Sequence, residues 1–327
     1  MISRQFTAYL LHFPGPLHIG DMRDDYGVSF QTLSSDAMYA ALTATLAKMG
    51  EAIPPTGDLG CTISGCTISS LFPYYQANQA AESILFFPKP MSFAPMAKDT
   101  QDIKTLKKIT WVDLHYLESI LKGDNLVKEN TIADVHDKIY LTQSECEKFI
   151  YSQVKNRVAV SRACEDANPF YMDDIHFTGH SGLYFLAEGD TTVIDKVLPL
   201  LMHEGIGTDR NVGHGHFEYQ KKEIEIQVPE DSDMGLLLST YIPTTSEILK
   251  KNLDHDGIAY QIVRRGGWIT QIGYNTQRKN AVYAFDAGSV LHGLDSGDGE
   301  IVDLAPNNFK EHKIWRCGKS IVLPIKI

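Results

Sequence analysis

The sequence lacks any long apolar run. Nowhere do about 18 apolar residues follow one another, as a membrane-spanning helix requires, and the first residues hold no apolar stretch followed by a small-residue cleavage site, so no export is expected. Cysteine is also scarce and irregularly spaced, unlike the framework of a small secreted domain. These absences favour a reducing cytoplasm without membrane contact. The five cysteines are Cys61, Cys66, Cys146, Cys164 and Cys317.

Positive charge is in short supply. The chain has 30 lysines and arginines against 41 aspartates and glutamates, a net charge of −11, whereas a protein that binds nucleic acid alone normally presents an excess of cations to the phosphates. The balance argues against an autonomous nucleic-acid binder, but a total does not say where the charges lie. With 43% hydrophobic and 22% charged residues, the 327-residue chain has ordinary globular composition and a length typical of about two domains.

Periodicity predicts several strands and two helices before residue 228. Polar and apolar residues alternate over 5–10 and 224–228, residues 84–87 form a short apolar run, and apolar residues recur three or four positions apart in the helices. Ser34 or Ser35 is a candidate N-cap of the first helix, Asp190 caps the second, and Asn168-Pro169 predicts a turn. The predicted strands are 5–10, 84–87, 157–160, 182–186 and 217–228, and the predicted helices are 36–49 and 191–201.

The order of these elements suggests a β-α-β-β-α-β unit, the ferredoxin-like arrangement. We therefore expect an α+β fold with two ferredoxin-like (RRM-like) domains. The first spans 1–228 and carries a polar, weakly periodic insertion at 91–153; the second spans 229–327. The short strands predicted in the second domain are 236–241, 259–263, 268–272, 281–285 and 320–324, with a helix at 246–253.

A glycine-rich loop follows the second helix. Its glycines leave backbone N–H groups without a Cβ in the way and tolerate positive φ, which suits contact with phosphate; a wide turn between helix and strand is the alternative. The loop lacks the Gly-Lys-Ser/Thr of a Walker motif and runs from helix to strand, the reverse of a dinucleotide-binding motif, so mononucleotide cofactors are disfavoured. The candidate contacts are Gly205, Gly207, Arg210, Asn211, Gly213, His214, Gly215 and His216.

The run 204–217 resembles the glycine loop of RAMP proteins, the RNA-binding subunits of CRISPR effector complexes. Four further stretches resemble the same family in the same order. The combination is most similar to the fourth subunit of type III-A (Csm) complexes, the RAMP subunit that holds the 5′ handle of the guide RNA. The four stretches are 16–20, 35–42, 85–90, and 155–157 together with 181–186.

The resemblance implies a subunit with no catalytic residue, metal or cofactor. Its partners would be the 5′ handle of the guide RNA (crRNA), the large polymerase-type subunit and the adjacent backbone RAMP subunit, with target RNA met only indirectly. Arginines at or beside predicted strand ends can face RNA on such a sheet, and a guanidinium suits phosphate geometry. Besides the loop, the candidate RNA contacts are His18, Arg157, Arg162, Arg264 and Arg265.

The resemblance also implies a hairpin, or thumb, that wedges between guide nucleotides. The insertion at 91–153 could supply it, because Lys104, Lys107 and Lys108 stand close to Trp111, a basic stretch beside a large flat side chain. A solvated surface insertion is the alternative, since aspartates lie among these lysines.

Two other functions remain open from the sequence. A histidine in a RAMP protein can be the general base of guide-processing cleavage, so one rival is a metal-independent endoribonuclease that uses His18 or His214. The other is an assembly scaffold whose loop touches only protein. A metal site is not expected, because neither His214-x-His216 nor Cys61-x4-Cys66 has a second ligand pair at zinc spacing.

Overall fold

The computed structural model describes residues 1–20, 27–54, 57, 66–93, 100–124, 133–160, 167–271 and 273–327, with only the backbone course of 100–102. Its main feature is a nine-stranded sheet in the order β11-β1-β10-β3-β4-β5-β7-β6, with β2 paired to β10 beside this path. The strands are β1 (Ile2–His12), β2 (Thr67–Ile68), β3 (Phe72–Tyr75), β4 (Ile84–Pro88), β5 (Trp111–Asp113), β6 (Val135–His136), β7 (Tyr140–Leu141), β10 (Gly182–Glu188) and β11 (Glu218–Val228).

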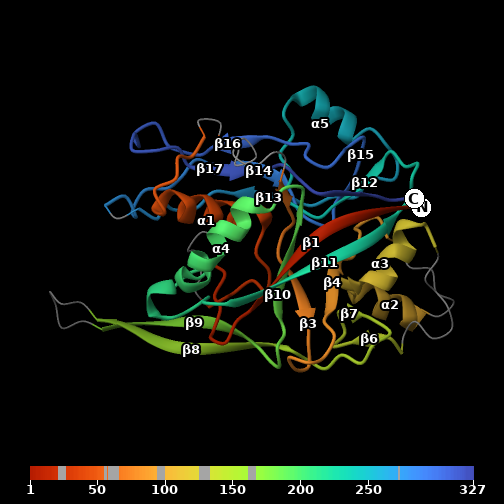
Figure 1. Cartoon of the computed structure of the whole chain (residues 1–327), viewed down its shortest axis with the longest axis horizontal. Coiled ribbons are helices and arrows are strands. Elements are labelled where there is room, and N and C mark those ends of the chain that lie inside the picture. Colours follow the sequence, from red (N-terminus) through yellow and green to blue (C-terminus); the bar gives the residue numbers. More distant parts are fainter. Residues whose placement is uncertain are drawn as a thin grey trace.

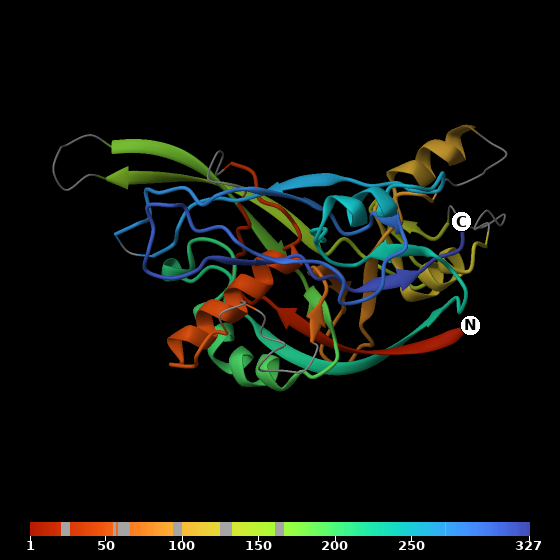
Figure 2. The same cartoon turned by 90° about the horizontal axis from the view of Figure 1, so that it is seen from above.

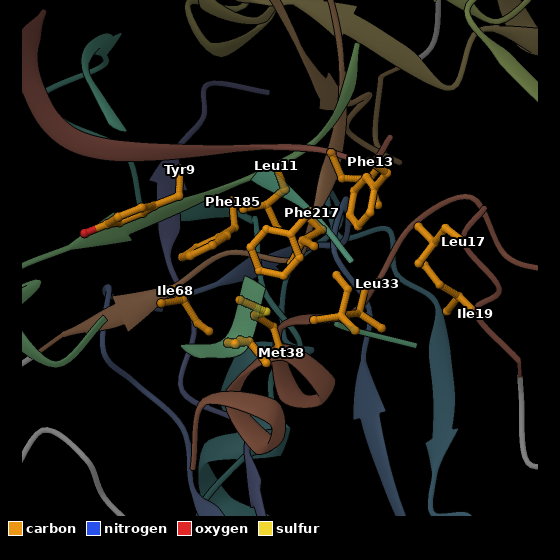
Figure 3. Packing of buried hydrophobic residues seen from close by; sticks show 14 of the residues in the cluster. Tyr9, Leu11, Phe13, Leu17, Ile19, Leu33, Met38, Ile68, Phe185 and Phe217 are labelled. Carbon is orange, nitrogen blue, oxygen red and sulfur yellow. The ribbon is translucent and has the colours of Figure 1, made fainter. Parts of the chain in front are cut away.

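Two helices, α1 (Ser35–Lys48) and α4 (Thr192–Glu204), pack side by side on one face of this sheet (Figure 1). Their apolar positions recur at helical spacing and form one stripe toward the strands. Figure 3 shows Tyr9, Leu11 and Phe185 of the sheet close to Met38 of α1. Both helices were predicted, so the periodicity of the sequence and the buried face agree. The other buried helix residues include Leu42, Leu46, Ile194, Leu198 and Leu201.

The opposite face of the sheet packs on the C-terminal part of the chain. Alternate residues of β1, such as Phe6 and Leu10, belong to a second core that also includes Leu236 and Leu323. Strand β1 is therefore apolar on both faces over its second half. The C-terminal elements are α5 (Ser246–Asn252), the three-stranded sheet of β12 (Met234–Leu237), β15 (Val290–His292) and β18 (Val322–Pro324), and the pairs β13 (Ile262–Arg265) with β14 (Val282–Phe285) and β16 (Ile301–Asp303) with β17 (Trp315–Cys317).

The segment predicted as an insertion extends the large sheet. It contributes β5, β6 and β7 together with α2 (Thr100–Lys108) and α3 (Leu114–Leu121). Strand β5 pairs with β4 and its Val112 is fully buried. Strands of two or three residues are too short to show a periodicity, so they could not be predicted from the sequence.

A long hairpin of β8 (Ile150–Val160) and β9 (Ala167–Phe177) projects from the body of the molecule (Figures 1 and 2). The turn predicted at Asn168-Pro169 is wrong, because both residues lie within β9, where Pro169 stands opposite Val158. An isolated two-stranded ribbon tolerates proline on its free side. Within the described ranges, no helix combines the length and apolarity that crossing a membrane requires.

Candidate nucleic-acid interface

The glycine-rich loop joins the end of α4 to β11 and is folded tightly against the turn after β1. Thr208 N donates to His18 O (2.9 Å) and Gly215 N donates to Pro16 O (2.8 Å). Gly207 and Gly215 have φ of +83° and +70°, and a Cβ on either would overlap a backbone carbonyl oxygen. These two glycines therefore permit both the left-handed backbone and the close approach.

His18 lies beneath this loop. Its imidazole is fully buried, and its Nδ1 is 2.6 Å from the carbonyl oxygen of Asp173 in β9. His18 thus connects the turn after β1, the glycine-rich loop and the base of the hairpin. The sequence indicated a ring that contacts RNA; the structure instead places the ring inside, where it orders the surface above it.

A group of charged side chains connects the loop to the hairpin, and we call it the loop–hairpin latch. Arg157 of β8 donates from Nη1 to Asp209 Oδ2 (3.1 Å) and from Nη2 to His214 Nε2 (2.9 Å). Behind them, Asp174 of β9 is fully buried and its Oδ2 is 2.9 Å from Lys155 Nζ. The latch therefore pairs two cations with two carboxylates, and it consists of Lys155, Arg157, Asp174, Asp209 and His214.

The contacts of His214 define its protonation. Because Nε2 accepts from Arg157, the ring proton belongs on Nδ1, which is 3.6 Å from Asp174 Oδ1. Burial lowers the pKa of His214 below its ordinary value of about 6.5, although the Asp174 carboxylate acts in the opposite direction. His214 is therefore a neutral acceptor for Arg157 at neutral pH, not a cation offered to phosphate.

The exposed part of the loop is its tip, a short turn over Arg210–Val212 followed by Gly213. Arg210 is half-buried, with Nη1 3.5 Å from the carbonyl oxygen of Gly205, and Asn211 is exposed. His216, also half-buried, follows on the way to β11. A guanidinium and an amide beside a glycine backbone are suitable donors to a phosphate oxygen.

The outer half of the hairpin is exposed on both faces. Arg157 lies on the face that contacts the loop. The other face carries Val154, Val158 and Tyr171, the last with 64% of its surface exposed. Apolar and aromatic side chains on a projecting ribbon are unusual for a surface that meets only water, and they suit stacking against bases.

The residues predicted to form the thumb lie elsewhere. Lys104, Lys107 and Lys108 are exposed on α2, but the ring of Trp111 packs toward Phe72, with centroids 5.9 Å apart, and contacts both cores. Trp111 is consequently unsuited to stack on a base. The projecting hairpin begins at Ile150, within the last residues of the predicted insertion, and continues beyond it.

Known proteins with one shared name are similar to this chain. A family profile described as the CRISPR Csm4 C-terminal domain matches residues 230–325. The protein called CRISPR system Cms protein Csm4 from Thermococcus onnurineus (strain NA1) is 26% identical over 81% of this chain and 82% of its own length; its namesake from Streptococcus thermophilus is 21% identical over 90% and 92%. The C-terminal part of the chain thus matches the Csm4 family, and most of the chain's length is similar to Csm4 proteins. This confirms the resemblance to RAMP proteins.

Solved structures are similar to this chain at the level of the fold. A chain in the crystal structure of the Csm3-Csm4 subcomplex in the type III-A CRISPR-Cas interference complex aligns with a TM-score of 0.61 and 19% identity, over 99% of this chain and 100% of that one. A chain in the crystal structure of the Csm1-Csm4 cassette in complex with cA4 aligns with a TM-score of 0.60 and 19% identity, over 99% of both chains.

The other arginines predicted as RNA contacts are dispersed. Arg264 is exposed on β13 and stands opposite Tyr283 of β14. Arg265, by contrast, turns inward and donates from Nε to Asp36 Oδ2 (2.9 Å), a structural pairing that the sequence did not reveal. Arg162 lies outside the described residues, as do Cys61 and Cys164.

Two features of the candidate interface were not predicted from the sequence. The latch carboxylates Asp174 and Asp209 were not singled out, and the 150–177 hairpin was not recognised as one unit. A signal was available for β8, since Gln153, Lys155 and Arg157 fall on one side of an extended strand, whereas Val154, Val158 and Val160 fall on the other. No group of three or more potential metal ligands occurs within the ranges that the structure describes.

Proposed function

We propose that this chain is a Csm4-type, non-catalytic subunit of a type III-A CRISPR interference ribonucleoprotein, and that it binds the 5′ handle of the guide RNA. The observation that carries the proposal is the exposed loop tip with Arg210 and Asn211, latched beside a projecting hairpin. Guanidinium and amide donors would hold the phosphates, while Tyr171 and the valines of the hairpin would meet bases.

The proposed protein partners are the large polymerase-type subunit and the adjacent backbone RAMP subunit. The fold shared with chains of the Csm1-Csm4 cassette and the Csm3-Csm4 subcomplex supports this. Partner surfaces would also explain how a chain of net charge −11 holds RNA, because their cations would add to the few that it presents. Such a complex would work in the cytoplasm.

We also propose that residues 1–228 form one ferredoxin-like domain and 229–327 a second. For the first, support comes from the antiparallel neighbours β11-β1-β10-β3, with α1 between β1 and the β2–β3 region and α4 between β10 and β11. For the second, only the sheet β15-β12-β18 and helix α5 give an outline.

The endoribonuclease hypothesis receives less support. A general base must come within hydrogen-bond reach of the 2′-hydroxyl that it deprotonates, but His18 and His214 are both buried and both bonded to protein groups. Incubation of the purified chain with repeat RNA in EDTA tests this directly. Site-specific cleavage that is lost in His18→Ala would refute the non-catalytic function.

RNA binding itself is tested by Arg210→Ala in the assembled complex. We expect faster release of the guide and a salt dependence of binding that is flatter by about 0.7 to 1 unit of slope, as for one lost phosphate contact. Lys196→Ala is the matched control, because it removes an exposed cation that pairs with Glu51 on the outside of α4. An unchanged slope for Arg210→Ala would favour the protein-only scaffold.

A further inference from the structure

Asp209 carries a negative charge in a loop that is proposed to bind the negatively charged phosphates of RNA. It lies near the tip of that loop, with 34% of its side chain exposed. Its backbone is left-handed (φ 54°), a conformation shared by only two other non-glycine residues in the described part of the chain, Asp137 and Lys138. A residue held in that region outside glycine often marks a functional constraint, and a carboxylate beside an RNA backbone would be repelled.

The side chain of Asp209 is directed at one nitrogen of Arg157. Its Oδ2 accepts from Nη1 at 3.1 Å, while Nη2 of the same guanidinium is held by His214 Nε2 at 2.9 Å. A phosphate offers an arginine the same kind of charged oxygen acceptor that a carboxylate does. The carboxylate of Asp209 therefore occupies the place at Nη1 that an RNA phosphate would take.

We propose that Asp209 is an affinity-setting residue, a carboxylate that holds the phosphate position on Arg157 until guide RNA displaces it. The inference rests on the proposed function, because it assumes that RNA reaches this loop. When a phosphate arrives, Asp209 leaves Nη1 and turns to solvent, and His214 keeps Nη2 anchored. Arg157 then contacts RNA without losing its orientation.

The surroundings of the pair suit such an exchange. Both partners are partly exposed, Arg157 by 27% and Asp209 by 34%, and ion pairs at that exposure are weak enough for a better acceptor to replace one partner. The other contacts of the latch do not involve Asp209: His214 of the loop stays bonded to Arg157 Nη2 (2.9 Å) and lies 3.6 Å from Asp174, which is fully buried and paired with Lys155. The exchange therefore changes one contact and leaves the connection between loop and hairpin in place.

The test compares Asp209→Asn with the unmodified chain in the assembled complex, using the fluorescein-labelled guide RNA of its own locus at several salt concentrations. We expect Asp209→Asn to bind about three- to tenfold more tightly, since both the competing acceptor and its repulsion of phosphate are lost. The slope of affinity against salt stays the same, because the number of phosphate contacts is unchanged. Arg157→Ala should lower that slope by about 0.7.

Two further variants make the outcome decisive. Glu51→Gln also raises the net charge by one, but in an exposed pair with Lys196 away from the loop, and it should leave guide affinity unchanged. Asp209→Gly removes the carboxylate and relieves the left-handed backbone, so it should tighten binding as Asp209→Asn does.

The failures are distinguishable. If neither Asp209 variant tightens binding while Arg210→Ala weakens it, the role of Asp209 is refuted and the proposed function stands. If Glu51→Gln tightens binding as much as Asp209→Asn, the gain is a general charge effect and the role of Asp209 is again refuted. If Arg210→Ala and Arg157→Ala both leave affinity and slope unchanged, the proposed function itself fails.

Discussion

Two aspartates of this molecule are each paired with arginine, and they differ mainly in burial. Asp209 meets Arg157 at the rim of the loop, where both side chains are partly exposed. Asp36, in the first turn of α1, is 1% exposed and is approached by Arg265 Nε (2.9 Å) and Arg316 Nη1 (3.6 Å), both from the C-terminal part of the chain. We call this second group the α1 seam.

The difference in burial separates an exchangeable contact from a permanent one. Burial alone would raise the pKa of Asp36, but Arg265 and Arg316 lower it below its ordinary value, so the carboxylate stays charged inside the protein. Arg265 also donates to Ser34 Oγ (2.5 Å). No solvent-borne phosphate could compete at the α1 seam without separating α1 from the C-terminal elements.

The largest effect should follow from removing the carboxylate of the α1 seam. Asp36→Ala leaves two arginines without their buried partner, and breaking such a pair costs about 3–5 kcal/mol. Urea unfolding of the purified chain measures this, and Asp209→Ala is the matched variant at the exposed pair, where we expect a loss below about 1 kcal/mol. Similar losses for both variants would show that burial does not distinguish the pairs.

In the glycine-rich loop, alanine should cost nearly as much stability at Gly215 as the loss of Asp36 does, but much less at Gly213. A Cβ at Gly215 would overlap Ile206 O, whereas a Cβ at Gly213 would have no neighbouring atom within 4 Å. Both glycines have positive φ. We expect Gly215→Ala to destabilise the chain by about 2–4 kcal/mol and Gly213→Ala by about 1 kcal/mol, the cost of left-handed backbone alone. Equal midpoints in thermal unfolding would contradict the tight packing of the loop on the turn after β1.

Sequence reasoning found what periodicity and glycine spacing encode. Helix α1 was predicted from its apolar stripe, and the strand β11 from the alternation of Ile224, Ile226 and Val228 with charged residues. The location of the glycine-rich loop was equally evident. Each of these signals lies within one continuous stretch of the chain.

Partnerships between distant residues could not be predicted in that way. Arg157 and Arg265 look alike in the sequence, each near the end of a predicted strand, yet one faces a loop 52 residues later and the other a helix 229 residues earlier. Likewise, nothing local marks His18 as buried. Only the folded arrangement decides whether an arginine is offered to a ligand or committed to the protein.

Two adjacent residues of the hairpin test the same contrast between an exposed and a buried side chain. Tyr171 is 64% exposed, while Met172 next to it is fully buried. Tyr171→Ala should change stability by less than about 0.5 kcal/mol but weaken guide or target binding, since stacking on a base contributes about 1–3 kcal/mol. Met172→Ala should cost about 2–5 kcal/mol of stability. Unaltered RNA binding by Tyr171→Ala would remove the hairpin from the proposed RNA surface.

The smallest effect concerns pH, and it should separate the latch from the α1 seam. Because the pKa of His214 is lowered in the folded chain, the unfolded chain binds more protons just below pH 6.5, so stability falls as the pH decreases through that region. Protonation at Nε2 also ends its acceptance from Arg157. Asp36 has a lowered carboxyl pKa, so its contribution to stability is lost only in much stronger acid.

The test measures melting temperature and guide release between about pH 7.5 and 5.5, and it compares the unmodified chain with His214→Gln. The glutamine keeps an acceptor for Arg157 but cannot titrate, so its profile should be flatter; coincident profiles would exclude His214 as the group that makes the latch sensitive to pH.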